Sequence, residues 1–152
     1  MNITSKSRYA LKILMDLAYH HQDMHVHRED ISRRQGVPQN YLDQIMLRLR
    51  KASLVDSVRG RGGGYRLAKA PQEITVYEIF CAVEDALFPV ECLSDARHCD
   101  YEDSCVSTSA WGQIYSAMVE PLRVMTLQQL VSNWAKAHQM CPMGGIKECR
   151  KG

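Results

Sequence analysis

A chain of 152 residues with 45% hydrophobic content can bury the core of one domain, which excludes an intrinsically disordered chain. The net charge of +2 hides a division, because residues 1–70 carry a balance of +7 and residues 71–152 a balance of −5. A basic N-terminal half suits a polyanionic partner such as nucleic acid, although an unevenly charged solvated surface gives the same numbers.

Charged residues interrupt the apolar stretch 3–19, which excludes a secretory signal or a membrane-spanning helix there. We therefore expect a cytoplasmic protein without a membrane partner. In a reducing compartment the six cysteines would indicate metal binding, redox chemistry or plain burial rather than disulfides.

The first three predicted helices suggest a helix-turn-helix. Apolar spacing predicts a helix from Ser5 to His20 that Ser5 caps, and a short one over 28–35 that Gly36 ends. A third helix opens at Gln39 or Asn40 and runs to about Lys51. Asn and Gln can read adenine, and Arg can read guanine, in the major groove of DNA, so this helix predicts DNA recognition unless it belongs to an ordinary helical hairpin. Its polar candidates are Gln39, Asn40, Asp43, Gln44, Arg48 and Arg50.

The next segment is typical of a β-hairpin wing. Strands are expected over 54–59 and 65–68, joined by a glycine-rich tip. Gly62 and Gly63 would let the backbone approach a phosphate chain, and Arg59 and Arg61 would reach the phosphates or a narrow minor groove. A nucleotide-binding loop is disfavoured because a strand, not a helix, follows the glycines.

A helix is predicted from Thr75 to about Ala86, in which Cys81 would be a core or partly exposed residue. An aperiodic acidic loop follows and contains Cys92, Cys99 and Cys105 in a C-x6-C-x5-C spacing. Three thiols on one polar loop can hold zinc or an iron–sulfur centre, although the close cysteine pair usual for zinc is missing. Three unliganded cysteines are the alternative.

A long helix after the cysteine loop carries an apolar stripe, which suits either a dimer seam or the core of one subunit. The stripe consists of Trp111, Ile114, Tyr115, Met118, Leu122 and Met125. Thr126 should cap a last helix that runs from Leu127 to about Ala137. The expected organisation is a DNA-binding domain over 1–86, a cluster-binding loop over 87–106, dimerisation and final helices over 107–137, and a mobile tail over 138–152 in which two further cysteines are idle.

Taken together, these residues resemble the Rrf2 family of bacterial regulators from residue 1 to about residue 134. The matching segments are Thr4-Ser5-Lys6, Arg8-Tyr9-Ala10, Tyr41-Leu42-Asp43-Gln44, Arg48-Leu49-Arg50-Lys51, Val58-Arg59-Gly60, Gly62-Gly63-Gly64-Tyr65, the three-cysteine loop and Ala110-Trp111. The resemblance implies a mainly α-helical fold with a small β-hairpin wing, and a homodimer that joins its long helices and binds double-stranded DNA. It also implies that Tyr41 lies with Asp43 and Gln44 at the start of the recognition helix, and that Cys92, Cys99 and Cys105 hold an iron–sulfur cluster.

The chain departs from the family at the fourth cluster ligand. One branch uses a histidine three residues after the third cysteine, where this chain has Thr108, and another uses an aspartate in the partner's first helix, where it has Arg8. An external ligand could complete the cluster, and both 2Fe–2S and 4Fe–4S types stay open. The protein candidates are Asp95, His98, Asp100, Glu102, Asp103 and Thr108.

The sequence therefore predicts a transcription regulator whose cluster senses iron, redox state or nitric oxide. The alternatives are a thiol- or zinc-based regulator of the same fold, and a cluster carrier that does not bind DNA. No catalytic triad, carboxylate pair or nucleotide loop indicates an enzyme, so no small-molecule substrate is expected.

Overall fold

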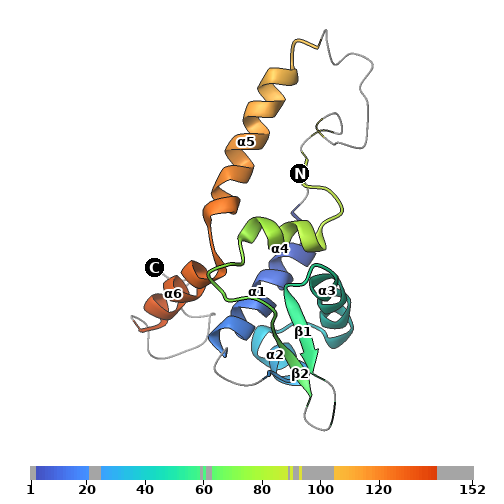
Figure 1. Ribbon diagram of the computed structural model, residues 1–152, viewed down its shortest axis with the longest axis vertical. Helices are drawn as coiled ribbons and strands as arrows, with labels where there is room; N and C mark the ends of the chain where they lie inside the picture. Colours follow the sequence, from blue (N-terminus) through green and yellow to red (C-terminus); the bar gives the residue numbers. More distant parts are fainter. Residues whose placement is uncertain are drawn as a thin grey trace.

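The computed structural model describes residues 3–20, 25–58, 60, 63–88, 90, 93 and 105–139. This part of the chain is mainly helical with one antiparallel hairpin, which confirms the predicted fold class (Figure 1). No helix in the described ranges is long and apolar enough to cross a membrane. The elements are α1 (Ser5–Tyr19), α2 (Arg28–Gln35), α3 (Gln39–Lys51), β1 (Val55–Val58), β2 (Gly64–Leu67), α4 (Val76–Val83), α5 (Thr108–Val124) and α6 (Leu127–Gln139).

Helix α1 runs through the middle of the fold and contacts α2, α3, α4, α6 and β2. Its apolar positions recur every three or four residues, so one face of the helix is buried. The prediction that Ser5 caps this helix is wrong, because Thr4 is the N-cap and its side chain accepts a hydrogen bond from the Lys6 N–H at 3.1 Å. Thr4 has the extended backbone that an N-cap needs, whereas Ser5 is already helical.

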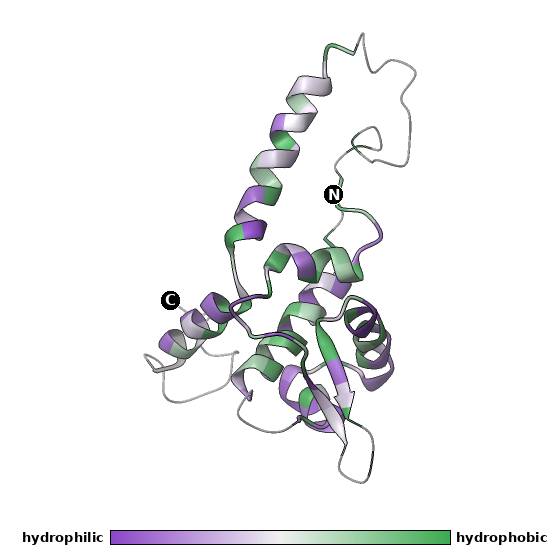
Figure 2. Cartoon of the chain, viewed as in Figure 1, coloured by the Kyte–Doolittle hydropathy of each residue, from purple (hydrophilic) through white to green (hydrophobic). Residues whose placement is uncertain are grey.

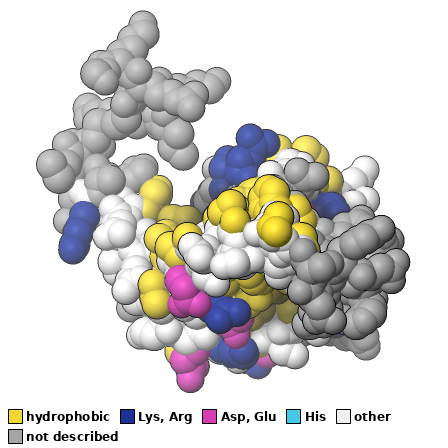
Figure 3. Space-filling model, turned by 90° about the horizontal axis from the view of Figure 1, so that it is seen from above, with side chains coloured by type: hydrophobic (Ala, Val, Ile, Leu, Met, Phe, Trp, Pro, Cys, Tyr) yellow, Lys and Arg dark blue, Asp and Glu magenta, His cyan; other side chains and the backbone are white. Residues whose placement is uncertain are grey.

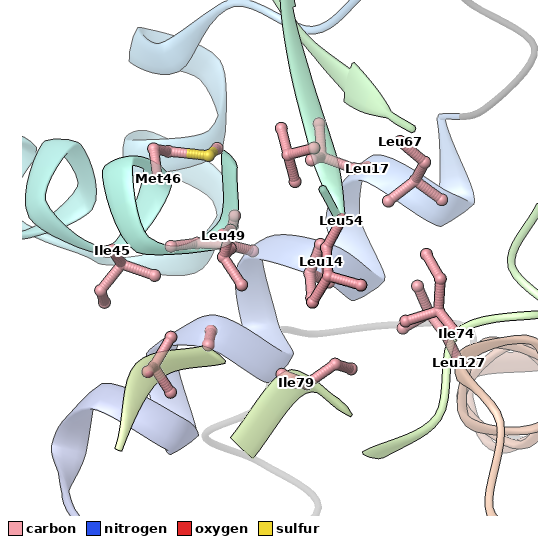
Figure 4. Packing of buried hydrophobic residues seen from close by; sticks show 14 of the residues in the cluster. Leu14, Leu17, Ile45, Met46, Leu49, Leu54, Leu67, Ile74, Ile79 and Leu127 are labelled. Carbon is pink, nitrogen blue, oxygen red and sulfur yellow. The ribbon is translucent and has the colours of Figure 1, made fainter. Parts of the chain in front are cut away.

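One hydrophobic core joins these elements (Figure 4). Side chains of α1, α3, the hairpin and α4 meet there, and the first residue of α6 enters from the C-terminal side. Full burial of a single leucine such as Leu14 contributes about 2 kcal/mol to the free energy of unfolding. The residues labelled in Figure 4 are Leu14, Leu17, Ile45, Met46, Leu49, Leu54, Leu67, Ile74, Ile79 and Leu127.

The turn between α2 and α3 has the predicted chemistry. Gly36 ends α2 in the left-handed conformation with φ of 62°, which a glycine adopts without steric cost. The Ser32 hydroxyl donates to the Val37 carbonyl at 2.7 Å, and the Pro38 carbonyl accepts the N–H groups of Tyr41 and Leu42. The turn therefore fixes where α3 begins.

The first strand of the hairpin begins one residue later than predicted and the second strand one residue earlier, and Val26 adds a bridge to the second strand. Val26 and Tyr65 exchange two backbone hydrogen bonds of 2.8 Å. A Cβ atom on Gly64 would collide with the Val26 carbonyl oxygen. Gly64 is therefore required by the close approach of two backbones.

Helix α4 ends at Val83, three residues earlier than predicted, and the following Glu84 turns toward the start of α1. Its carboxylate accepts four hydrogen bonds, from the N–H groups of Thr4 (2.9 Å) and Ser7 (3.3 Å) and from their hydroxyls (2.9 and 2.6 Å). Burial raises the pKa of Glu84, but the hydrogen bonds from Ser7 and Thr4 outweigh it and hold the pKa below its ordinary value. A buried carboxylate thus joins α4 to the positive N-terminal end of α1.

We expect Glu84→Gln to lower the free energy of unfolding at neutral pH by about 1.5–3 kcal/mol, because an amide cannot accept all four donors as a carboxylate does. Since the folded pKa lies below the unfolded value of 4.5, this contribution is complete above that pH and is lost as the pH falls through the lowered value. Urea unfolding at a series of pH values measures both effects.

Glu120→Gln is the matched control, because Glu120 is exposed and forms an ion pair of 3.6 Å with Arg123, which is also exposed. It should change the free energy of unfolding by no more than about 0.5 kcal/mol. The stabilising role of the Glu84 carboxylate would be contradicted if Glu84→Gln and the wild type had equal free energies of unfolding, or if their difference did not shrink in acid.

We also expect opposite effects from alanine at two glycines. Gly64→Ala should destabilise the protein, because the added methyl group forces Val26 away from the hairpin. Gly112→Ala should stabilise it by about 0.5–1 kcal/mol, since Gly112 lies within helix α5 with open space around its Cβ position. Chemical unfolding of the two variants measures both effects. A Gly64→Ala variant more stable than the wild type would contradict the close approach of the Gly64 and Val26 backbones.

Candidate functional site

Helix α3 exposes a continuous polar stripe opposite its buried face. Leu42, Ile45, Met46 and Leu49 face the core, and the helical period places the remaining positions outward. The predicted residues Gln39, Asn40, Gln44 and Arg50 are all exposed. Their amides and guanidinium are therefore accessible to a partner that lies along this helix.

Two other predicted DNA-binding residues, Tyr41 and Asp43, are engaged within the protein. The Tyr41 hydroxyl lies 3.1 Å from the Ser5 Oγ, and its ring packs edge-on against Tyr9 at 5.3 Å. Asp43 accepts a hydrogen bond of 3.3 Å from Arg28. These contacts join α3 to α1 and α2.

Arg48 projects from the side of α3 that adjoins α4. Its guanidinium donates to the Val83 carbonyl and to Asp85, each at 2.9 Å. The hydrogen bonds from Arg48 and Lys6 hold the pKa of Asp85 below its ordinary value. Arg48 thus links α3 to the end of α4, and its predicted contact with DNA stays a prediction.

Only part of the wing tip lies among the described residues, and Arg59, Arg61 and Gly62 lie outside them. Gly63 donates its N–H to the Gly60 carbonyl at 2.9 Å, and a Cβ on Gly63 would collide with the Val58 carbonyl. The Gly63 carbonyl accepts a hydrogen bond of 2.7 Å from the His27 ring nitrogen. His27, which sequence reasoning missed, therefore ties the wing to the N-cap of α2.

A shallow hollow of about 420 Å³ lies between α3 and the hairpin. Arg50, Lys51 and Arg66 line it, with Arg66 also 3.5 Å from Asp56. Leu47 stands beside them with 53% of its surface exposed. Lys51, Arg66 and Leu47 were not among the predicted contacts, although the outward period of α3 could have identified Leu47 and Lys51.

The cysteine loop is described only at its end, because Cys92, Cys99 and the candidate fourth ligands over 95–103 lie outside the described residues. Cys105 is half-exposed just before α5, with its Sγ 3.2 Å from the Ser107 Oγ. Hydrogen bonds from Ser107 and Thr108 lower the pKa of the Cys105 thiol from 9.0 to about 7. The lowered pKa favours the thiolate, which is the form of cysteine that ligates metals.

In the part of the chain that the structure describes, no three His, Cys, Asp or Glu side chains come together as a metal site. Thr108, the position of the family's histidine, is the first residue of α5 and donates its N–H to the Cys105 carbonyl at 3.3 Å. Cys81 is exposed on α4, and Cys141 and Cys149 lie outside the described residues. Of the three predicted cluster ligands, Cys105 is therefore the one that lies within the described residues.

Helix α5 extends away from the rest of the fold (Figure 1), and hydrophobic and hydrophilic residues alternate along it (Figure 2). Its predicted apolar stripe divides into two parts. Tyr115 faces the rest of the fold, where it packs on Phe88 with ring centroids 5.4 Å apart. Burial and a hydrogen bond with Tyr77 raise the pKa of Tyr115 to about 12. Ile114 and Met125, by contrast, expose 44% and 38% of their surfaces.

Hydrophobic side chains are also visible on the end of the molecule seen in Figure 3, with basic and acidic side chains around them. On α5 and at its C-cap, Ile114 and Met125 are not buried by any of the described residues. Exposed apolar residues along one helix favour contact with another protein surface.

Comparisons with known proteins agree on one family. Residues 3–133 match the Rrf2 family, which is described as an iron-dependent transcriptional regulator. The HTH-type transcriptional regulator IscR of Pectobacterium carotovorum is 40% identical over 133 residues, which cover 88% of this chain and 80% of that protein. IscR of Photobacterium profundum is 40% identical over 131 residues, or 86% and 76%.

Solved structures give the same result. CymR of B. subtilis, described as the global cysteine regulator, is 34% identical with a TM-score of 0.71, over 88% of this chain and 98% of that one. T. potens IscR is 31% identical with a TM-score of 0.71, over 90% of each chain. The relatives named here are regulators rather than enzymes.

Proposed function

Because the chain belongs to the Rrf2 family of transcriptional regulators, we propose that it binds operator DNA through α3 and the wing under the control of an iron–sulfur cluster on Cys92, Cys99 and Cys105. The observation that carries DNA binding is the exposed stripe of α3, whose amides adjoin a basic edge. The amides of Asn40 and Gln44 suit the edge of adenine, while Arg50 and Lys51 suit phosphates. Arg59, Arg61, Gly62 and Gly63 would hold the adjacent backbone or minor groove.

We expect Gln44→Ala to weaken binding to the operator about 5–150-fold, because a lost base contact costs about 1–3 kcal/mol, and to leave nonspecific binding almost unchanged. Arg50→Ala should weaken binding to all sequences and reduce the salt slope by about 1. Titrations at several salt concentrations measure both. Gln72→Ala, at an exposed residue near Pro71 and outside α3, is the control and should bind like the wild type. The interface is wrong if Gln44→Ala binds the operator as tightly as this control.

The cluster proposal is supported by the family's iron-dependent description and by the chemistry of Cys105. Three thiolates match the ligand type of an iron–sulfur centre, and such a centre would supply iron that oxidants, nitric oxide or iron shortage can remove. Cys105 is joined to α5 through Ser107 and Thr108. A change at this thiol would therefore reach the start of the long helix.

We expect anaerobically purified wild-type protein to be coloured and to carry iron and sulfide, and each of Cys92→Ser, Cys99→Ser and Cys105→Ser to lose most of both. Cys81→Ser is the matched control, because Cys81 is exposed on α4 and is not a proposed ligand. Absorbance, metal analysis and native mass spectrometry read the result. Colourless, iron-free wild-type protein would refute the cluster.

A thiol-based regulator is the second candidate function, which the similarity to a protein described as a cysteine regulator favours. The lowered pKa of Cys105 would serve that chemistry as well. Reversible thiol oxidation that changes DNA affinity in protein free of iron would support this function. Measurement of the zinc content would distinguish a zinc-based regulator from one that uses free thiols.

We further propose that the protein is a homodimer whose α5 helices pair through the outward stripe of Trp111, Ile114, Met118 and Met125. Two α3 helices in a symmetric dimer would read a pseudo-palindromic operator. The support is the exposure of Ile114 on a helix that stands away from the core (Figure 1) and of Met125 at the C-cap of that helix.

We expect Ile114→Asp to convert the dimer to a monomer, because a charge in the seam would lose its hydration. Ser116→Asp places the same charge on the opposite side of α5, where Ser116 is exposed, and should stay dimeric. Analytical ultracentrifugation distinguishes the two states. A wild-type monomer, or a dimer in both variants, would count against this seam.

A further inference from the structure

A pocket of about 410 Å³ lies between α1, α2 and α6, and no residue of α3 lines it. Its walls are mainly apolar and come from Met15 and Tyr19 of α1 and Val131 and Trp134 of α6. The rings of Tyr19 and Trp134 meet edge to face at 5.1 Å. This volume and this kind of lining are typical of small-molecule sites.

The polar groups of the pocket come from the buried Asp16 and the end of α2. The Asp16 carboxylate, with 3% of its side chain exposed, accepts two hydrogen bonds from Arg34 (2.9 and 2.6 Å) and one from Gln35 (2.9 Å). This pairing neutralises the carboxylate and holds the guanidinium in place.

Lys12 adds a second cation to the pocket. Its Nζ donates one hydrogen bond of 3.2 Å to the Gln35 carbonyl, while an ammonium group has three protons to donate. Lys12 and Arg34 against Asp16 leave one positive charge in excess among these three lining residues, and the imidazole of His20, which also lines the pocket, adds no negative charge. An apolar pocket with one excess cation selects an apolar molecule that carries one negative charge.

We propose that this pocket binds a small carboxylate with an aromatic or branched apolar body. The body lies between Tyr19, Trp134 and Met15, and the carboxylate faces Lys12. A cationic ligand is disfavoured by the excess charge, and a strongly polar one by the apolar walls. Because Arg34 and Gln35 are the last two residues of α2, a bound ligand stabilises the helix that leads into the turn before α3.

Calorimetric titration of the full chain with three probes of one shape tests the proposal: 4-phenylbutyrate, the neutral 4-phenylbutanamide and the cationic 4-phenylbutylamine. The acid should bind at least tenfold more tightly than the amide, and the amine should bind most weakly. Lys12→Met should weaken binding of the acid about tenfold or more, since hydrogen bonds to charged groups are the strong ones, and should spare the amide.

Lys136→Met is the matched control, because it removes an exposed lysine from α6 that does not line this pocket. Val131→Phe should fill the pocket and abolish binding, with circular dichroism to confirm that both pocket variants fold. The proposal is overturned if no probe binds at millimolar concentration, if acid and amide bind equally, or if the Lys12→Met and Lys136→Met variants bind the acid alike.

Discussion

The burial of the apolar face of α1 is the constraint on which the remaining elements depend. Helices α2, α3, α4 and α6 and strand β2 all contact this helix, so its position sets the positions of the others. Its two ends are held by buried carboxylates. Glu84 accepts four hydrogen bonds at the N-terminal end, and Asp16 pairs with Arg34 near the C-terminal end. Each carboxylate has its donors in place, so its burial is compensated and fixes the orientation of a neighbouring helix.

This arrangement gives the proposed regulation a contiguous physical route. Cys105 adjoins the start of α5, and Tyr115 of that helix contacts Tyr77 of α4. Val83, the last residue of α4, and Asp85 just after it are in turn bonded to Arg48 of α3, the proposed recognition helix. A displacement of α5 that moves α4 would thus alter the setting of α3, and a coupling of about 1–3 kcal/mol changes operator affinity about 5–150-fold.

The sequence was most informative where local chemistry decides the structure. The glycine at position 36 and the predicted start of a helix at Gln39 or Asn40 correctly placed the turn and the bounds of α3. Tertiary contacts decided the rest. An arginine on this helix is the residue type expected to contact DNA, but the fold brings Arg48 to Val83 and Asp85. Likewise, nothing local indicates that Glu84 leaves its helix to meet Thr4, or that Val26 makes a side chain at position 64 impossible.

The central claim is that the state of the cysteine loop decides how tightly α3 and the wing hold DNA. It is tested most directly by selecting binding sites from random duplex DNA with anaerobically purified, cluster-loaded protein and, in parallel, with the same protein after removal of iron. The account predicts enrichment of a pseudo-palindromic sequence and an affinity for it that differs about 5–150-fold between the two forms. Equal affinities of the two forms for every selected sequence, or no enrichment by either form, would contradict it.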